Sequence, residues 1–442
     1  MIKNMDMYSE KFDICSGCSL SVYHTDRFKC DTLKLSIAFP ADADDKNTAL
    51  FGLMINVLRS GTEKYPTRAD ITKRLNDLYD SSCSIGGFAS GDNRILEISA
   101  EMLNDEYVFG EKVFDGICEL MYQMLFKPTL DKNGFFVYET VEREKNVILD
   151  KIKSEKNNSK SYAFRRCREI MCDGVPYGMS IKPEFIKKIT PKEITEFYKN
   201  FIENANIKFS YVGKKKGAEV SCALNHYFGK QKFLEPQNLA ALSAIKSSEM
   251  IFVEEELDIK QGVLVLGMTT GMLLDSELSY VMPVFNNIYG GTYTSRLFKT
   301  VREEMSLCYY CDSDYVNTKG VLFVSCGIDV NNVNKAQKAI LDELNKLKLE
   351  GVSEKELEIA KKLTIKELRE MLDFPSSIAS FRYGREIYGI NMTIEELINK
   401  VSTVTSIDIK NVAKKIEPNT VFFLKGTLAG AEDCADEQNN RI

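Results

Sequence analysis

The sequence predicts an α+β fold of two homologous domains, each a mostly antiparallel sheet covered by helices. Three observations lead to this prediction. The chain has 442 residues, more than one ordinary hydrophobic core holds. Its strand-like segments come in hairpin pairs, and hairpins covered by helices form α+β sandwiches rather than doubly wound sheets. The same order of segments also occurs twice along the chain, as expected of an internal repeat.

The first half of the chain has the order strand, helix, helix, hairpin, helix. Residues 31–40 alternate apolar and polar side chains, as a half-buried strand does. Pro66 then opens a helix near Thr67, and the segment Gly91-Asp92-Asn93 forms the hairpin turn. The expected elements are strands at 31–40, 81–90 and 94–102, and helices at 46–59, 67–80, 104–126 and 137–158.

The second half repeats this order of segments at an offset of about 225–230 residues. Its hairpin turns at the segment Asn317-Thr318-Lys319-Gly320, and glycines close its apolar helix. The expected elements are strands at 261–269, 307–315 and 320–328, and helices at 276–291, 294–305, 331–351 and 354–372. The repeat places an N-terminal domain at residues 1–228 and a C-terminal domain at residues 251–426.

Two segments show neither strand nor helix periodicity. Residues 229–250 lie between the two repeats and are predicted to be the linker. Residues 427–442 are small, polar and acidic, a composition typical of a disordered tail.

The composition is that of a soluble globular protein, with 44% hydrophobic and 28% charged residues. The formal net charge of -6 is mild, and no basic block occurs, so we expect no nucleic-acid partner. The apolar runs are short and broken by charges, so we expect no membrane partner. The first twenty residues lack the apolar region of a secretory signal, which favours a cytoplasmic protein.

The chain has 12 cysteines, which a cytosol would keep as reduced thiols. Two Cys-x-x-Cys pairs occur, Cys15 with Cys18 and Cys308 with Cys311. The second pair lies in a strand-like run, where residues i and i+3 point to opposite faces of a sheet. We therefore expect ordinary thiols, and a metal or redox role for these pairs is the least favoured hypothesis.

Histidine is the most informative residue type, because the chain has only two of them. His24 lies in a strand-like stretch and His226 in a polar helix, and neither has a second histidine within one helical turn. A zinc-binding His-x-x-x-His pair therefore cannot be built. We expect both histidines to be structural.

Motifs in both halves resemble the M16 (insulinase/pitrilysin, inverzincin) metallopeptidases in their short, two-domain form. The matching segments are RSGTEKYPT (59–67), EREKNVILDKI (142–152), VPYGMSIKPEFIKKITPKEITEFYKNFIENANIKFSYVGK (175–214), DIKQGVLVLGM (258–268) and GGTYTSRLFKTVREEMSLCYY (290–310). In this family a His-x-x-Glu-His motif on the first apolar helix binds zinc and activates a water molecule. The resemblance also implies that the first strand of the second domain, 261–269, could offer an edge to a bound peptide.

The zinc motif would fall on residues 52–56, just before the Gly-Thr loop. Gly52 and Asn56 stand where the family has zinc-binding histidines, and Ile55 stands where it has the general base. Glycine and isoleucine cannot bind zinc or carry a proton, and a neutral amide is a weak zinc ligand. A further zinc-binding glutamate of the family would align with Glu142 or Glu144, which we expect on the solvated face of a charged helix. The chain is therefore expected to hold no metal and to hydrolyse no peptide alone.

A second part of the family's active site is retained. M16 peptidases carry an arginine and a tyrosine seven residues apart that hold the substrate and stabilise the oxyanion of the transition state. The matching residues are Arg302 and Tyr309. A guanidinium fork and a phenol are suitable donors to a developing negative charge. From spacing alone, Arg302 could instead pair with Glu303 or Glu304, and Tyr309 could pack within the sheet.

The resemblance implies a division of labour between two subunits. We expect a non-catalytic, substrate-binding subunit of a heterodimeric zinc peptidase, which supplies Arg302 and Tyr309 in trans to a sister subunit that carries His-x-x-Glu-His and the zinc. In the absence of that sister the chain could form a homodimer. The alternative hypothesis is a catalytically inactive structural or peptide-binding protein on the same scaffold.

Overall fold

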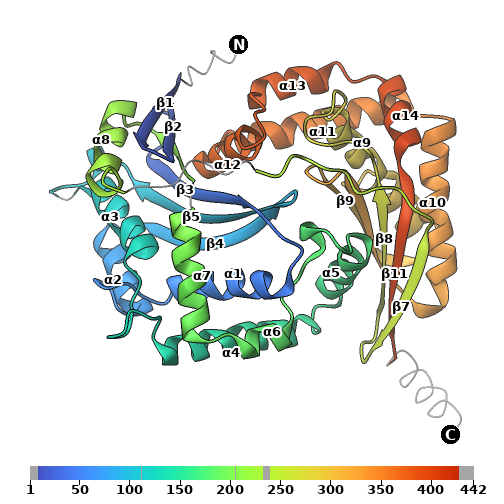
Figure 1. The fold of residues 1–442 in the computed structure, drawn as a ribbon. Coiled ribbons are helices and arrows are strands. Elements are labelled where there is room, and N and C mark those ends of the chain that lie inside the picture. Colours follow the sequence, from blue (N-terminus) through green and yellow to red (C-terminus); the bar gives the residue numbers. More distant parts are fainter. Residues whose placement is uncertain (1–7, 111, 205, 232–238, 428–442) are drawn as a thin grey trace, which may run out of the picture. The chain divides into compact units, whose positions relative to one another are not determined.

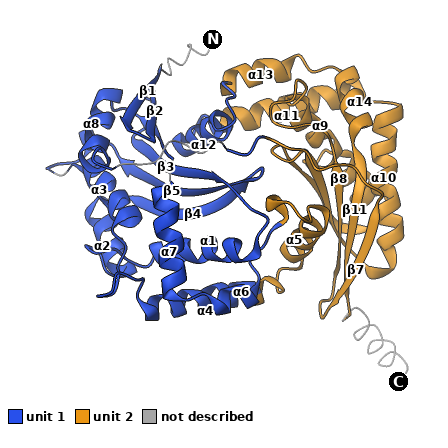
Figure 2. Cartoon of the chain, viewed as in Figure 1, with its two compact units in different colours: residues 1–152, 179–241, 371–391 blue, residues 153–178, 242–370, 392–442 orange. Residues whose placement is uncertain are grey.

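The structure is a computed structural model that describes residues 8–110, 112–204, 206–231 and 239–427. The chain divides into two compact units (Figures 1 and 2). Unit 1 consists of residues 1–152, 179–241 and 371–391, and unit 2 of residues 153–178, 242–370 and 392–442. Each unit is built around one β-sheet.

Unit 1 contains a six-stranded sheet in the order β1-β2-β6-β3-β5-β4. Strands β2 and β6 are parallel, and the other neighbours are antiparallel. Its strands are β1 (Tyr8–Cys15), β2 (Cys18–His24), β3 (Cys30–Pro40), β4 (Ser82–Ser90), β5 (Asn93–Leu103) and β6 (Ile207–Gly213). Its helices are α1 (Asp45–Leu58), α2 (Arg68–Asp77), η1 (Asp105–Tyr107), α3 (Val113–Phe126), α4 (Tyr138–Glu155), α6 (Pro183–Lys188), α7 (Pro191–Glu203), α8 (Gly217–Phe228) and α12 (Pro375–Glu386).

Unit 2 contains a five-stranded sheet in the order β7-β11-β8-β10-β9. Only β7 and β11 are parallel among its described neighbours. Its strands are β7 (Ile251–Leu257), β8 (Gly262–Thr269), β9 (Cys308–Val316), β10 (Val321–Ile328) and β11 (Glu417–Gly426). Its helices are α5 (Ser159–Met171), η2 (Pro176–Gly178), α9 (Val281–Tyr289), η3 (Phe298–Glu304), η4 (Val330–Asn332), α10 (Val333–Leu349), α11 (Glu354–Met371), α13 (Ile394–Ser402) and α14 (Ser406–Lys415).

The two sheets confirm the predicted repeat. Strands β2, β6, β3, β5 and β4 have the same order and the same single parallel pair as β7, β11, β8, β10 and β9. The α+β prediction is therefore confirmed. One expectation about the second sheet is wrong: β8, which matches the predicted strand 261–269, is not an edge, because β11 and β10 flank it on both sides.

The compact units do not coincide with the sequence repeats 1–228 and 251–426, because each unit takes one helix from the other half of the chain. Helix α5 contacts β8 and β11 in unit 2, and α12 contacts β3 and β6 in unit 1 (Figure 2). The reason lies in the sheets. All eight residues of β8 are buried, so both faces of this strand need cover, and α5 supplies one of the two covers.

Helix α5 covers one face of the unit 2 sheet with apolar side chains. Cys167 is fully buried, and the ring of Phe164 lies 4.8 Å from that of Phe323 on β10, centroid to centroid. Val265 of β8 belongs to the same apolar cluster.

In the linker 229–250, residues 239–250 contain neither helix nor strand, while 232–238 lie outside the described residues. The predicted tail lies outside them from residue 428 onward.

Candidate functional site

The three positions that match the zinc motif lie on α1. This helix begins after Asp44, whose side chain accepts a hydrogen bond from the backbone N–H of Asn47 at 2.7 Å. Ile55 is 7% exposed and lies against the backbone of Gly87 on β4: a Cβ added to that glycine would be 2.3 Å from Ile55 Cδ1. The position of the general base is therefore part of the hydrophobic core.

Positions 52 and 56, which match the zinc-binding histidines, also cannot bind a metal. A Cβ added to Gly52 would lie 2.4 Å from Cδ1 of Ile181, so this apolar side chain fills the space of the first ligand. The amide of Asn56 donates to the backbone carbonyl of Gly52 at 3.2 Å, which turns it toward its own helix. In residues 8–110, 112–204, 206–231 and 239–427, no three His, Cys, Asp or Glu side chains are placed to hold a metal ion. The residues present do not fit a zinc ion.

Glu144 differs from the sequence-based expectation of a solvated residue, which is wrong. Its side chain is fully buried, and its carboxylate pairs with Arg68 at 2.7 Å and with Arg143 at 3.1 Å. The Ser60 hydroxyl, at the end of the α1 segment, lies 3.0 Å from Oε1 of the same carboxylate. Glu142 points outward and pairs with Lys145 at 2.7 Å. Glu144 is thus a buried ion-pair residue, because its helix packs on the loop after α1.

Arg302 and Tyr309 lie close along the chain at the junction of η3 and β9. Both side chains are exposed, Tyr309 by 71%. Among the described residues Arg302 forms no ion pair, either with Glu303 or with Glu304, and its guanidinium lies 4.6 Å from the ring centroid of Phe298. Neither structural alternative for this pair, an ion-paired arginine or a packed tyrosine, is found. The structure thus presents, on one segment, an exposed arginine that forms no ion pair with a described carboxylate and an exposed tyrosine hydroxyl.

A β-bulge explains the exposure of Tyr309. In the antiparallel pair of β9 and β10, Gly327 pairs with Tyr310 but Ile328 pairs with Cys308, which leaves Tyr309 as the extra residue. Bulges re-aim side chains in this way and recur next to functional sites. The preceding η3 helix is a π-helix rather than the predicted α-helix at 294–305. Spacing in the sequence contains no signal for either feature.

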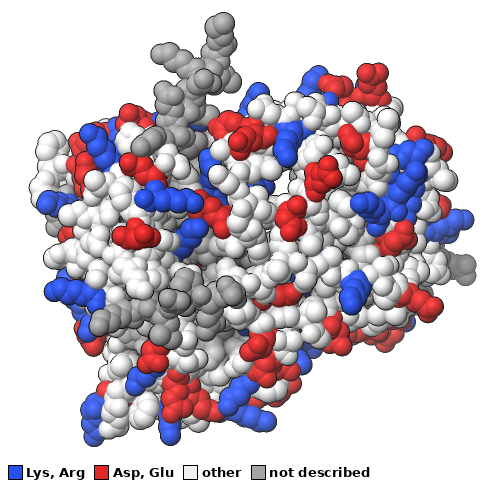
Figure 3. All heavy atoms as spheres, turned by 45° about the horizontal axis from the view of Figure 1, so that its top comes forward, with Lys and Arg blue, Asp and Glu red and all other residues white. Residues whose placement is uncertain are grey.

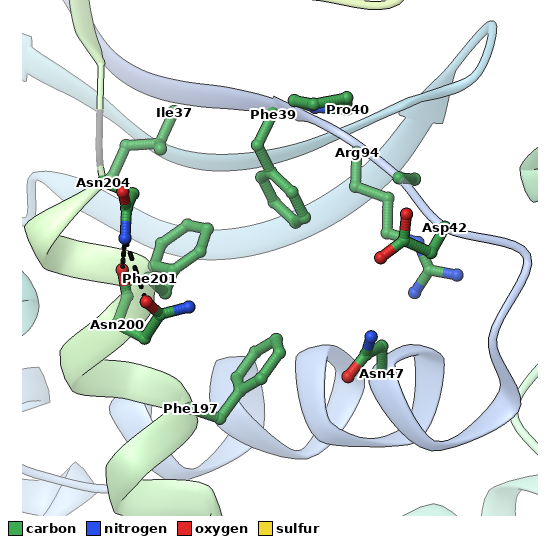
Figure 4. Close-up of a pocket in the computed structure, with 11 residues that line it drawn as sticks. Ile37, Phe39, Pro40, Asp42, Asn47, Arg94, Phe197, Asn200, Phe201 and Asn204 are labelled. Atoms are coloured by element: carbon green, nitrogen blue, oxygen red, sulfur yellow. Dashed lines mark hydrogen bonds between the residues drawn. The ribbon is translucent and has the colours of Figure 1, made fainter. Parts of the chain in front are cut away.

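A cavity of about 230 Å³ opens beside the first turn of α1 in unit 1 (Figure 4). Figure 4 shows aromatic rings from β3 and α7, with the amides of Asn200 and Asn204 at one end and the polar side chains of Asp42, Asn47 and Arg94 at the other. Its lining residues are Ile37, Phe39, Pro40, Ala41, Asp42, Asn47, Arg94, Phe197, Asn200, Phe201 and Asn204. The positions of the degenerate zinc motif are not among them. No sequence pattern marks this cavity, because its aromatic residues look like ordinary core residues.

Two charged side chains of opposite sign, Arg94 and Asp42, line this cavity. Burial lowers the pKa of the Arg94 guanidinium, which stacks 5.8 Å from the ring centroid of Phe51 and donates to the Thr48 hydroxyl. The cavity therefore combines aromatic rings with one cation and one carboxylate, and its lining favours neither an anionic nor a cationic ligand.

The two histidines lie away from these features, since His226 is exposed on α8 against Tyr227 and His24 ends β2. Over the face drawn in Figure 3, acidic and basic side chains are interspersed. Such a mixed surface creates no extended field of one sign. No helix in the described ranges combines the length and apolar character that a membrane crossing requires.

Comparisons with known proteins agree with this architecture. Residues 188–364 match the family described as "Peptidase M16 inactive domain". The "Probable inactive metalloprotease YmfF" of Bacillus subtilis (strain 168) is 26% identical over 417 residues, which is 93% of this chain and 96% of that protein.

Two solved structures share the fold. A conserved protein from Enterococcus faecalis V583 has a TM-score of 0.86 at 22% identity, and a peptidase M16 inactive domain from Pseudomonas fluorescens has a TM-score of 0.77 at 17% identity. Each comparison covers 95% of this chain and 99% of the other. The family match over residues 188–364, the relative of nearly equal length and the shared fold make this chain similar to M16 peptidases, and it lacks the His-x-x-Glu-His motif.

Proposed function

We propose that this chain is the non-catalytic, substrate-binding subunit of a cytoplasmic, heterodimeric M16-type zinc peptidase. It supplies Arg302 and Tyr309 to a peptide bound at the zinc of a sister subunit that carries His-x-x-Glu-His. The chain itself binds no zinc and cleaves no peptide.

The observation that carries this proposal is the exposure of the arginine and tyrosine pair. A purely structural arginine would be ion-paired and a purely structural tyrosine would be packed, but Arg302 forms no ion pair within the described residues and Tyr309 is 71% exposed. A bulge holds Tyr309 outward. Groups that stay unpaired and outward are available to bind a ligand, and their fixed N–H and O–H donors suit an oxyanion.

The state of the zinc positions supports the need for a partner. Ile181 fills the space beside Gly52, and Ile55 is packed in the core, so a metal cannot be accommodated without repacking. Hydrolysis of a peptide bond by the family mechanism needs a metal-bound water and a base. These groups therefore have to come from another chain.

The test uses the full chain and an M16 protein with an intact His-x-x-Glu-His motif from the same organism. Cleavage of a quenched fluorogenic peptide is measured for each protein alone and for the mixture. We expect zinc in the sister only and full cleavage only in the mixture. Arg302→Ala and Tyr309→Phe should each lower kcat of the mixture about 100-fold or more, the usual cost of losing one oxyanion donor.

Two neighbouring residues provide matched controls. Lys299→Ala removes an exposed cation from the same η3 helix, and Tyr293→Phe removes the hydroxyl of a tyrosine that is 82% exposed. Both control variants should keep the activity of the mixture. If Arg302→Ala and Tyr309→Phe mixtures are fully active, the proposal is wrong, and the inactive structural or peptide-binding protein becomes the better hypothesis.

A further inference from the structure

Three cysteines of unit 2 meet on one face of its sheet. Cys311 on β9 and Cys326 on β10 are directly opposite each other in the antiparallel register. Opposite residues in such a pair have Cα atoms about 4.5 or 5.5 Å apart, a separation that a disulfide can span. Both thiols are free and buried, with Cys311 4% exposed and Cys326 fully buried.

The bulge at Tyr309 brings the third cysteine to the same face. In a regular strand Cys308 and Cys311 would point to opposite faces, as the sequence predicted. Because Tyr309 is the extra residue, Cys308 pairs instead with Ile328, which is two residues from Cys326 and therefore on its face. The expectation that Cys308 and Cys311 point to opposite faces is thus wrong, and the physical reason is the shifted register.

The surroundings of Cys308 favour its thiolate. Hydrogen bonds from the thiols of Cys311 and Cys326 lower the pKa of Cys308 strongly, and the charge of Arg302 lowers it further. The same hydrogen bonds raise the pKa of Cys311 and Cys326. The charge of Asp312, the next residue on β9, adds to the rise in the pKa of Cys311, and Cys311 in turn contributes to the raised pKa of Tyr289. Cys308 is only half-buried, so the thiolate of the cluster is also its accessible member.

The other cysteines within residues 8–427 that the structure describes lack this arrangement. Burial raises the pKa of Cys18 and of Cys167. Cys30 and Cys222 are exposed, and burial together with acidic neighbours raises the pKa of Cys30. Reactive thiols are partly exposed and lie beside cations and hydrogen-bond donors, whereas buried thiols in apolar surroundings are inert.

We propose that Cys308 is a reactive thiol that undergoes exchange with small disulfides, and that a buried thiol of the cluster resolves the product into a disulfide within the sheet. The Cys308 thiolate attacks a disulfide R–S–S–R, so a Cys308–S–S–R bond forms and one RS⁻ leaves. Cys326 then loses its proton, attacks the Cys308 sulfur and releases the second RS⁻. Cys311 in turn loses its proton and attacks the Cys326 sulfur, which forms the Cys311–Cys326 disulfide between directly opposite residues and returns the Cys308 thiolate. Two protein thiols are oxidised, and one small disulfide is reduced to two thiols.

This site does not depend on a zinc-bearing partner. Its chemistry is read on the isolated full-length chain, so failure of the proposed peptidase role would leave it unaffected. In the first experiment the reduced protein is treated briefly with iodoacetamide at pH 6, 7 and 8, and each cysteine is quantified by peptide mass spectrometry. We expect Cys308 to react at pH 6 at least about tenfold faster than Cys222, because a thiolate is already present.

The pH dependence of the alkylation rate distinguishes a thiolate from a thiol that is only accessible to the reagent. The rate at Cys308 should change little between pH 6 and 8, while the rate at an ordinary exposed thiol should rise about tenfold for each pH unit. A Cys308 that reacts no faster than Cys222 at pH 6, with the same steep profile, would overturn the proposal.

The second experiment uses oxidised glutathione as the disulfide. The wild-type chain should release two glutathione molecules and retain none, whereas a Cys311→Ala/Cys326→Ala variant should retain one on Cys308. Cys308→Ser should leave the cluster reduced, and Cys222→Ser is the control that should behave as wild type. Far-UV circular dichroism checks that each variant is folded. Oxidation of the Cys308→Ser variant at the wild-type rate would contradict the role of Cys308.

Discussion

At the residue scale, the substitutions that remove the zinc motif are integrated into the packing of α1. Ile55 and Gly52 adjoin the apolar side chains of Phe51 and Ile181, so two of the three positions that match the zinc motif have apolar neighbours. Glu144 is different, since its fully buried carboxylate lies between Ser60, Arg68 and Arg143. A buried carboxylate persists only where it is paired and hydrogen-bonded.

This difference gives a prediction for the two glutamates of α4. Glu144→Gln removes the charge that two arginines share, and should lower the free energy of unfolding by about 2 kcal/mol. Glu142→Gln keeps an acceptor for Lys145 at a partly exposed pair, and should cost less than about 1 kcal/mol. Urea denaturation followed by circular dichroism measures both values. Equal losses in the two variants would mean that burial does not distinguish these residues.

At the element scale, the connection from η3 to β9 positions the three side chains for which we propose roles. Arg302 lies on the π-helix, Tyr309 is the bulged residue of β9, and Cys308 precedes it. Ser306 makes the turn between the two elements with φ +51°, in the left-handed region that favours glycine. The backbone N–H of Leu307 then donates to the carbonyl of Val301 at 3.0 Å, which closes the helix.

The strained Ser306 yields a stability prediction. Ser306→Gly should raise the free energy of unfolding by roughly 0.5–1 kcal/mol, because relief of the left-handed strain exceeds the extra entropy of glycine in the unfolded chain. Ser306→Ala keeps a Cβ at the same position and serves as the control, with no gain expected. Thermal unfolding of the three proteins measures this. A gain of similar size in the alanine variant would rule out the strain as its cause.

At the scale of the whole molecule, each sheet depends on a helix from the other half of the chain. Helix α12 covers a face of the first sheet through polar contacts as well as apolar ones. Lys34, 6% exposed, donates to Ser380 at 2.7 Å, and Glu386 accepts from Tyr23 at 2.5 Å and pairs with Lys208 at 2.8 Å. Without α12 these buried polar groups would lose their partners.

The dependence on α12 predicts how a fragment behaves. Residues 1–241 expressed alone should show no cooperative urea transition and should bind a hydrophobic dye, because the face of β3 and β6 under α12 is uncovered. A synthetic peptide of residues 371–391 added to the fragment should restore cooperative unfolding, and a scrambled peptide should not. A fragment that unfolds cooperatively without the peptide would contradict this view of α12.

Local sequence patterns predicted much of the fold. Alternation of apolar residues and turn signals located β3, α1 and the hairpin of β4 and β5 within a few residues, because these patterns reflect which side of an element is buried. The repeat predicted two sheets of one topology, which the strand orders confirm. The substitutions Gly52, Ile55 and Asn56 are equally plain from sequence, because the chemistry of a ligand depends on residue type.

The sequence by itself determined the fold class, the repeat and the loss of the zinc ligands, since each depends on residue type and local periodicity. Only the tertiary structure decided which helix covers which sheet, that Glu144 is buried, and that Cys308 joins Cys311 and Cys326 on one face. These features depend on what lies opposite a residue in space. A one-residue shift of register reverses the face of a side chain, and no local pattern records that shift.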